Sequence, residues 1–278
     1  MSRAVPEGGR SVVTLLSAFT VVVVSSSRGA AQRGATLTVF AAASLTEPFS
    51  QLGKSFEAAH PGTTVRFNFT GSQQLVLQIQ QGAKADVFAS ADERWMQTAK
   101  DSGLVEGEPV LFARNELVVI VPVANPAGIK RLQDLSRSGV KLVIAAEAVP
   151  VGHYTREMLT KLSSQPGFGP KYDQQVLANV ASYEENVKGV VAKVQLGEAD
   201  AGVVYRSDAT GAGASQVSVL TIPDAANVVA SYPIAVVRGA PSPELAQAFV
   251  ELVRSAPGQE SLEKSGFRGV KPGTQPSP

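Results

Sequence analysis

Residues 36–60 read TLTVFAAASLTEPFSQLGKSFEAAH, and this stretch decides the fold. Its first six residues are rich in β-forming side chains and predict a buried strand at 36–41. Phenylalanine and leucine then recur at helical spacing, which predicts a helix at 46–60 that ends before a Pro-Gly pair. Three alanines and Ser44 join the two elements. A strand, a short junction of small residues and a helix form the repeating unit of an α/β protein.

The same unit recurs along the rest of the chain. Strands are predicted at 64–69, 86–90, 116–122, 141–145, 201–205, 218–222 and 232–237. Helices are predicted at 72–81, 93–102, 129–136, 154–162, 186–196 and 243–254. This alternation indicates an α/β fold with mostly parallel sheets flanked by helices. Ligands of such sheets bind at the carboxyl ends of strands, where helices begin, so the strand-to-helix junctions are the candidate site.

The composition excludes several classes of protein. Of the 278 residues, 44% are hydrophobic, which is too many for a disordered chain. The 25 basic and 24 acidic residues give a net charge of +1, whereas a nucleic-acid-binding protein needs a basic surface. The chain has no cysteine, which excludes disulfide frameworks, thiolate metal sites and thiol nucleophiles. Two histidines argue against a multi-histidine metal site.

The N-terminal segment has the features of a secretory signal peptide in the usual order. Arg3 and Arg10 precede an apolar run at 11–24, which is too short to span a bilayer because that needs about 20 apolar residues. Small residues follow, and we expect a signal peptide at 1–31. An uncleaved anchor and a buried helix are the alternatives. Since no cysteine is present to carry a lipid anchor, the mature chain is expected to be soluble and periplasmic.

Four junctions place hydroxyl groups or backbone amides at predicted helix starts. They are centred on Ser44, Ser72, 149–152 and 184–187. Each could be a simple cap, since Ser and Asn are favoured at helix N-termini. The N-terminal end of a helix also carries a partial positive charge and unpaired N–H groups. Several such ends that meet at one point would bind an oxyanion without Lys or Arg.

Five blocks of sequence carry a resemblance to a known family. They are VFAAASLTEPF (39–49), NFTGSQQLVLQIQQGAKADVFASADERWM (68–96), AVPVGHYTREML (148–159), ENVKGVVAKVQLGEADAGVVYRSDA (185–209) and YPIAVV (232–237). With these blocks in this order, the chain from Thr36 to Phe267 resembles the periplasmic molybdate-binding proteins of ABC transporters. The resemblance implies a type II periplasmic binding protein fold, in which two α/β lobes are joined by two crossover strands and the ligand lies in the cleft between them.

The resemblance also implies that one lobe is built from two separate parts of the chain. We expect the two crossings near Asn115 and Ser231. The expected parts are lobe 1 at 33–115 and 231–268, lobe 2 at 116–230, and a disordered tail rich in Gly, Pro and Ser at 269–278.

The family's oxyanion site carries over to five positions of this chain: Ser44, Ser72, Val151, Val187 and Tyr205. By this resemblance the serines supply hydroxyl groups, the valines supply backbone N–H groups and the tyrosine supplies its phenol. Val151 stands where the family usually has Ala. The larger side chain is expected to be tolerated, because only the backbone N–H is needed as a donor. Gly71 stands where the family often has Ser, so we expect a lost secondary contact or a looser loop there.

The chemistry of these positions suits an anion that carries no proton. Molybdate is a tetrahedral dianion without a proton at pH 7, so it needs hydrogen-bond donors only. None of the five positions is a carboxylate, which disfavours hydrogen phosphate because that ion has a proton to donate. Sulfate is also proton-free and is the alternative ligand. An enzyme on the same scaffold is the alternative function, but no base stands beside a hydroxyl to activate it.

Other polar residues near the junctions are not assigned to the site. His153 follows the third junction and is expected to be an exposed residue of the first helical turn. Four carboxylates have no spacing typical of a metal-binding loop and are expected to form caps and turns: Asp86, Asp92, Asp200 and Asp208.

The sequence therefore predicts a monomeric binding protein that captures molybdate, and tungstate with it, and delivers it to an ABC permease. No cofactor, resident metal or nucleic-acid partner is expected. Removal of residues 1–31 would leave 22 basic and 23 acidic residues, a net charge of −1. Capture is then expected to depend on local donors and only weakly on ionic strength.

Overall fold

The computed structural model describes residues 1–4, 8 and 34–270. Nearly all of the expected signal peptide and most of the expected tail lie outside these residues. The described strands are β1 (Ala35–Ala42), β2 (Thr63–Thr70), β3 (Val87–Ala89), β4 (Val110–Pro122), β5 (Leu142–Ala145), β6 (Val180–Glu184), β7 (Ala201–Tyr205), β8 (Val217–Thr221), β9 (Val229–Val236) and β10 (Arg268–Gly269). The described helices are α1 (Thr46–Ala59), α2 (Ser72–Gln80), α3 (Glu93–Asp101), α4 (Pro150–Ser163), α5 (Tyr172–Ala178), α6 (Val187–Gln195), α7 (Pro243–Arg254) and α8 (Ala256–Lys264).

The strands form one mixed sheet in the order β2-β1-β3-β9-β4-β7-β5-β6, with β8 and β10 also paired to β4. The pairs β1–β2, β1–β3, β5–β6 and β5–β7 are parallel. Every antiparallel pair between the described strands involves β4 or β9. The expected parallel arrangement therefore holds within each half of the sheet. The antiparallel pairs arise where the chain passes from one half to the other and returns.

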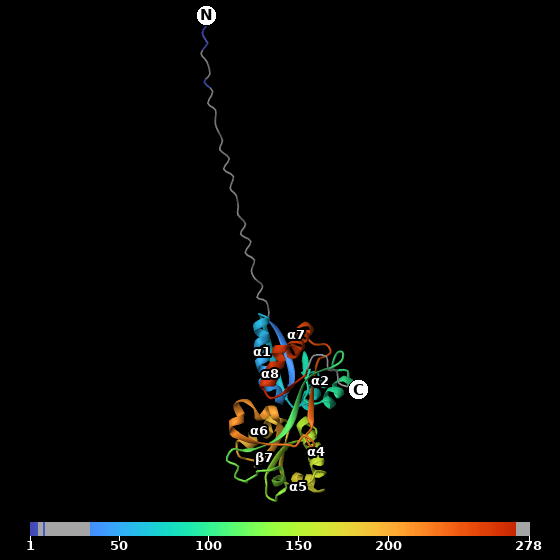
Figure 1. Ribbon diagram of the computed structural model, residues 1–278. Helices are drawn as coiled ribbons and strands as arrows, with labels where there is room; N and C mark the ends of the chain where they lie inside the picture. Colours follow the sequence, from blue (N-terminus) through green and yellow to red (C-terminus); the bar gives the residue numbers. More distant parts are fainter. Residues whose placement is uncertain (5–7, 9–33, 271–278) are drawn as a thin grey trace. The chain divides into compact units, whose positions relative to one another are not determined.

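The long strand β4 belongs to both halves. Its residues 110–116 pair with β9, and its residues 117–120 pair with β7. The change of partner falls between Glu116 and Leu117, next to the crossing expected at Asn115. Figure 1 shows β4 running from the half that contains α1, α7 and α8 to the half that contains α4, α5 and α6.

Aromatic side chains fill the core of the first half. The periodicity of α1 predicts that Phe49, Leu52 and Phe56 share one face, and all three side chains are buried. The rings of Phe49 and Phe56 each lie 5.6 Å from the ring of Phe249 on α7, edge to face. Burial of each such side chain stabilises the fold by about 1.5–3 kcal/mol, and edge-to-face contacts add to this.

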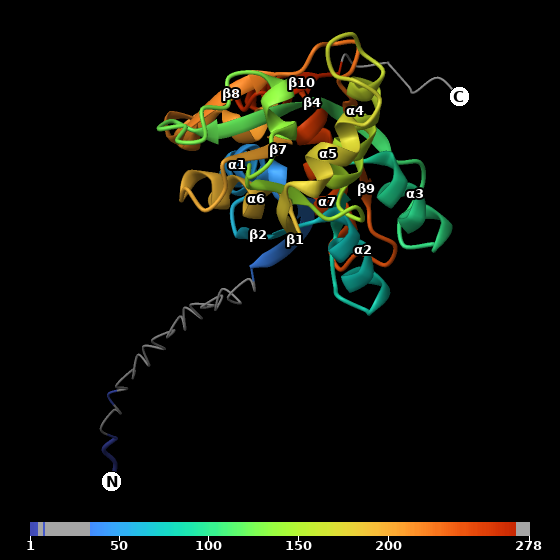
Figure 2. The same ribbon diagram turned by 90° about the horizontal axis from the view of Figure 1, so that it is seen from below.

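Apolar side chains without rings fill the second half, where helices cover the β5–β7 region of the sheet. Ile144 on β5, Met158 on α4, Val190 on α6 and Val203 on β7 are fully buried. Figure 2 shows α6 and α4 on different sides of β7. The carboxyl ends of β5 and β7 therefore meet the starts of two helices.

Some elements differ from the sequence prediction. The helix expected at 129–136 is a 3₁₀ helix at Leu132–Ser136, and β4 begins six residues before the expected strand at 116–122. The sequence analysis missed β6, α5 and α8. The strand β6 lacks an apolar run because its exposure alternates, and α8 begins with Ala-Pro-Gly, which is typical of a turn. Ser255 caps α8 by accepting a hydrogen bond from a first-turn amide.

The helix α4 begins at Pro150, four residues before the expected start, and lies against the end of β5. Proline is favoured in the first turn of a helix, because its nitrogen has no hydrogen to leave unpaired there. A Cβ atom on Gly152 would lie 2.0 Å from the carbonyl oxygen of Ala146 and 2.4 Å from that of Ala145. Only glycine allows the helix to start this close to the strand.

We predict that Gly152→Ala displaces the start of α4 and lowers the free energy of unfolding by about 1–3 kcal/mol, because the atoms in the way are backbone atoms that cannot rotate aside. Urea denaturation followed by circular dichroism measures this loss. Gly189→Ala on α6 is the matched control, since a Cβ there meets only the flexible Glu184 side chain. Equal stability of the two variants would contradict the packing argument.

Candidate functional site

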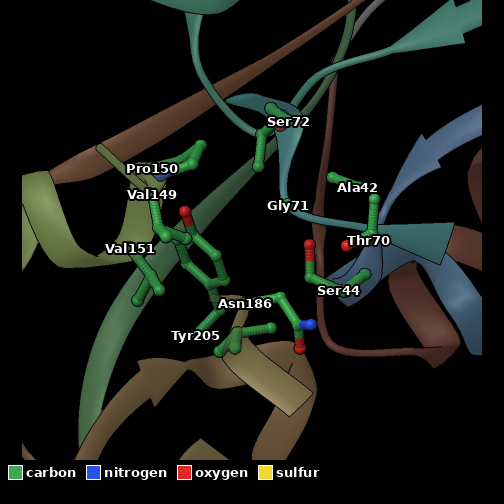
Figure 3. Close-up of a pocket in the computed structure, with 13 residues that line it drawn as sticks. Ala42, Ser44, Thr70, Gly71, Ser72, Val149, Pro150, Val151, Asn186 and Tyr205 are labelled. Atoms are coloured by element: carbon green, nitrogen blue, oxygen red, sulfur yellow. The ribbon is translucent and has the colours of Figure 1, made fainter. Parts of the chain in front are cut away.

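A small pocket lies where several helices begin. It contains about 220 Å³ of space not filled by atoms, counting its open mouth. All five predicted site residues line it, and none of its lining residues is charged. The lining residues are Ala42, Ala43, Ser44, Thr70, Gly71, Ser72, Ala91, Val149, Pro150, Val151, Asn186, Val187 and Tyr205. The fold thus brings together every position that the resemblance singled out (Figure 3).

Ser44 and Ser72 lie at helix starts, but their hydroxyl groups do not cap those helices. Ser44 lies in the single 3₁₀ turn before α1, and Ser72 is the first residue of α2. Neither helix start has a side-chain cap, so the capping alternative does not account for these serines. The Oγ of Ser72 accepts a hydrogen bond from the backbone N–H of Ala91 at 3.0 Å. Its own proton is therefore free to be donated to a ligand.

Val151 and Val187 line the pocket at two further helix starts. Val151 is the second residue of α4 and Val187 is the first residue of α6. Amides in the first turn of a helix have no intrahelical acceptor, so both are available as donors. Asn186 caps α6, because its Oδ1 accepts a hydrogen bond from the N–H of Gly189 at 3.2 Å.

Tyr205, the last residue of β7, is the clearest sign of a ligand site. Its side chain is buried, and its hydroxyl has no hydrogen-bond partner among the described residues. Buried polar atoms in proteins almost always have a partner. Figure 3 shows the ring extending into the pocket with its hydroxyl toward the side that Pro150 and Ser72 line. Burial raises the pKa of Tyr205 well above its usual range, so the hydroxyl stays protonated and can donate.

Gly71 is required by the closeness of the two halves at the mouth of the pocket. A Cβ atom at this position would lie 2.6 Å from the backbone oxygen of Glu185. Close by, the side chain of Gln73 donates a hydrogen bond to that same oxygen at 2.9 Å. The glycine therefore permits a tight contact at this point.

A buried carboxylate lies behind the pocket. The Oδ2 of Asp208 accepts a hydrogen bond from the backbone N–H of Tyr205 at 3.3 Å, and its Oδ1 lies 3.2 Å from the Nζ of Lys188. Lys188 also contacts Glu47 on α1 at 2.9 Å. Burial raises the pKa of Asp208 to about 6, although Lys188 opposes this shift. The cation next to Val187 is thus neutralised by carboxylates and leaves the pocket without a free positive charge.

Three other carboxylates accept hydrogen bonds from backbone N–H groups, and Asp92 forms the expected cap, whereas Asp86 and Asp200 join segments far apart in the sequence. Asp92 caps α3 by accepting from the N–H of Trp95 at 2.8 Å, and Asp86 accepts from the N–H of Thr38 at 2.7 Å. Asp200 accepts from the N–H of Lys141. In residues 1–4, 8 and 34–270 no three His, Cys, Asp or Glu side chains are grouped as a metal site.

His153 does not line the pocket. Its side chain is half-buried on α4, not exposed as the sequence analysis expected, because α4 begins earlier than predicted. No helix in the described part of the chain is long and apolar enough to cross a membrane.

The sequence analysis missed a tyrosine that contacts a site residue. Tyr232 on β9 is fully buried, and its hydroxyl lies 3.0 Å from the Oγ of Ser44. Its block, YPIAVV, contributes to the resemblance, but nothing in the pattern gives the tyrosine a role. A polar aromatic residue inside an otherwise apolar strand was the available signal, because a buried Tyr hydroxyl needs a partner.

The arrangement is a neutral pocket with hydrogen-bond donors at helix starts, which suits a small anion. Residues 37–268 match the family model of bacterial extracellular solute-binding proteins, and the chain belongs to this family. It is 41% identical over 243 residues to the molybdate-binding protein ModA of Mycobacterium tuberculosis, which covers 87% of this chain and 88% of that protein. It is 32% identical over 238 residues to ModA of Escherichia coli, with 83% and 88% covered.

Solved structures show the same fold. The periplasmic molybdate-binding protein of Azotobacter vinelandii matches with a TM-score of 0.73 at 20% identity, over 84% of this chain and all of that one. The sulfate-binding protein SubI of Mycobacterium tuberculosis matches with a TM-score of 0.74 at 18% identity, over 86% of this chain and 88% of that one. The predicted two-lobed periplasmic binding protein fold is confirmed.

We predict that Asp208→Asn becomes more stable relative to the wild type as the pH rises from about 4 to about 6. In this range the unfolded chain ionises Asp208 while the folded chain keeps its proton, so the wild type loses stability, by up to about 1.4 kcal/mol per pH unit. The asparagine does not titrate and keeps an oxygen for the Tyr205 amide. Urea denaturation across this pH range measures the difference in free energy of unfolding.

Ser207→Ala is the control, because it changes a buried neutral neighbour and should shift stability by the same amount at each pH. A stability difference between Asp208→Asn and the wild type that does not vary with pH would show that burial does not hold the proton on Asp208.

Proposed function

We propose that this protein captures molybdate, and tungstate with it, outside the cytoplasm and delivers it to the permease of an ABC transporter. The observation that carries the proposal is the unpartnered buried hydroxyl of Tyr205, in a neutral pocket lined by helix starts. The names of the ModA relatives support molybdate as the ligand. The sequence of residues 1–31 supports export to the periplasm.

The donor set suits a proton-free dianion. The hydroxyls of Ser44, Ser72 and Tyr205 and the amides of Val151 and Val187 are all donors, and no carboxylate lines the pocket. Charge-assisted hydrogen bonds each contribute about 1.5–3 kcal/mol net. Five such donors around one small anion would hold it without a cationic side chain, and helix N-termini add a favourable potential.

We propose that the pocket lies between two lobes, at 33–115 with 231–268 and at 116–230. The change of strand partner within β4 supports this division. Ser44 and Ser72 then belong to lobe 1, and Val151, Val187 and Tyr205 belong to lobe 2. An anion held by both sets of donors would draw the lobes together, and the permease would read the closed form.

Sulfate is the second candidate ligand, because it is also a proton-free tetrahedral dianion and a sulfate-binding protein shares the fold. We propose that the protein is not an enzyme, since no base among the described residues is hydrogen-bonded to Ser44, Ser72 or Tyr205. We also propose that the protein acts as a monomer without a cofactor or a nucleic-acid partner.

Calorimetric titration with molybdate, tungstate, sulfate and phosphate tests the proposal. We expect tight binding of molybdate and tungstate and little or no binding of phosphate. Ser44→Ala and Ser72→Ala are each expected to weaken molybdate binding about 10- to 100-fold, the equivalent of one charge-assisted hydrogen bond. His153→Ala is the control and should bind molybdate like the wild type, because His153 does not line the pocket. A preference for sulfate would overturn the choice of ligand.

Side chains bridge the two proposed lobes around the mouth of the pocket. The Nε1 of Trp95 and the Nη2 of Arg94, both on α3, donate to the carbonyl oxygen of Ala148 at 2.7 and 3.1 Å. Across the mouth, the Nε2 of Gln74 donates to the Oε2 of Glu185 at 2.9 Å. These contacts would form only when the lobes are close, so they would stabilise the closed form.

We predict that Trp95→Phe raises the dissociation constant for molybdate about 2- to 10-fold, because it removes one hydrogen bond to Ala148 and keeps most of the ring's packing. Calorimetry measures the change. Gln97→Ala is the matched control on the same helix, since the described hydrogen bond of Gln97 is to Asp101 within α3. Unchanged affinity in Trp95→Phe would mean that this contact does not favour closure.

A further inference from the structure

The buried hydroxyl of Tyr232 contacts the proposed site without lining the pocket. Tyr232 lies on β9 and is fully buried, and its Oη is 3.0 Å from the Oγ of Ser44. A hydroxyl pair at this distance shares one hydrogen bond, which either oxygen could donate. The direction of that bond decides whether the proton of Ser44 faces Tyr232 or the pocket.

Asn115, on the neighbouring strand β4, offers Tyr232 no acceptor. Its Oδ1 accepts a hydrogen bond from the backbone N–H of Glu116 at 2.9 Å, and its Nδ2 donates to the Oγ of Ser207 at 2.8 Å. The backbone donor identifies which amide atom is the oxygen, so the NH₂ group faces the interior. An amide NH₂ group can only donate.

Among the described hydrogen bonds, the hydroxyl of Tyr232 has one partner, the Oγ of Ser44. Burial raises the pKa of Tyr232 well above its usual range, so the phenol keeps its proton. A buried phenol proton needs an acceptor, and the Oγ of Ser44 is the acceptor within reach. Ser44 accepts that proton and must turn its own proton away from Tyr232.

The hydroxyl of Ser72 is also held as a donor toward the pocket, in this case by a backbone group. Its Oγ accepts from the N–H of Ala91, a group that can only donate. Both pocket serines are thus acceptors toward the protein and donors toward the pocket. Ala91 is a backbone donor and is fixed by the fold, whereas the partner of Ser44 is a side chain that can be changed.

We propose that Tyr232 is a positioning residue that holds the Ser44 hydroxyl as a donor toward the bound anion and so excludes protonated tetrahedral anions. The inference rests on the proposed function, since it needs an oxyanion in the pocket. Hydrogen phosphate must donate its proton to an acceptor. When both serine hydroxyls are held as donors, neither of them accepts that proton. Removal of the Tyr232 hydroxyl frees Ser44 to rotate and to accept.

The experiment is calorimetry at pH 7 with molybdate and inorganic phosphate on the wild type, Tyr232→Phe, Ser44→Ala and the double variant. Tyr232→Phe is expected to weaken molybdate binding about 3- to 10-fold, the equivalent of one hydrogen bond, and to raise the affinity for phosphate relative to molybdate. The double variant is expected to bind molybdate as Ser44→Ala does, because Tyr232 acts through Ser44. Additive losses would overturn the inference.

Tyr172→Phe is the matched control. Tyr172 is also fully buried, and its hydroxyl donates to the backbone oxygen of Leu132, away from the pocket. This variant should lose stability and keep the molybdate affinity and the selectivity of the wild type. Equal changes in anion selectivity for Tyr172→Phe and Tyr232→Phe would show a general loosening and overturn the inference.

The anion preference of Ser44→Ala provides a second route if Tyr232→Phe does not fold. Loss of the Ser44 hydroxyl should raise the affinity for phosphate relative to molybdate, because the donor that faces the anion is gone. An unchanged preference would overturn the inference. A wild type that binds none of the four anions would instead overturn the proposed function.

Discussion

The unpaired backbone N–H groups at the first turns of helices are the constraint on which the pocket depends. A helix cannot satisfy these groups internally, and a helix end that is buried needs partners from outside. In this protein the starts of α2, α4 and α6 and the turn before α1 line one pocket. The resulting surface combines backbone N–H groups with hydroxyl groups, and none of the residues that line it is charged. That polarity comes from the main chain, and the side chains of Ser44, Ser72 and Tyr205 extend it.

Much of the fold follows from local patterns in the sequence. The apolar faces of α1 and α6 and the buried strands β1, β5 and β7 are strongly periodic, and the structure has them where the sequence predicts them. Weak patterns were less informative: β6 is short and alternates in exposure, and the Pro-Gly at the start of α8 is typical of a turn. The start of α4 was placed too late because Pro150 and Gly152 suggest a loop, although proline suits a first turn and glycine suits a close approach.

The sequence predicts which residues line the site but not how they are arranged in space. The resemblance gave Ser44, Ser72, Val151, Val187 and Tyr205, and all five line one pocket. No local pattern shows that Tyr232, 188 residues from Ser44, lies within hydrogen-bond distance of it. Long-range contacts of this kind depend on the strand order, in which β9 lies beside β3. The direction of a hydrogen bond depends in turn on which acceptors lie within reach of the donor, and the sequence alone does not show these.

The strand pair β4–β9 has a consequence for how an anion would enter. Because the two strands are hydrogen-bonded along residues 110–116, neither can slide past the other, and they bend as a single ribbon. Opening about this ribbon would separate the donors as two rigid groups, with Ser44 and Ser72 on one side and Val151, Val187 and Tyr205 on the other. An incoming anion would first bind the donors of one group, which are already in place. It would lose its remaining water in a second step, when the donors of the other group reach it together.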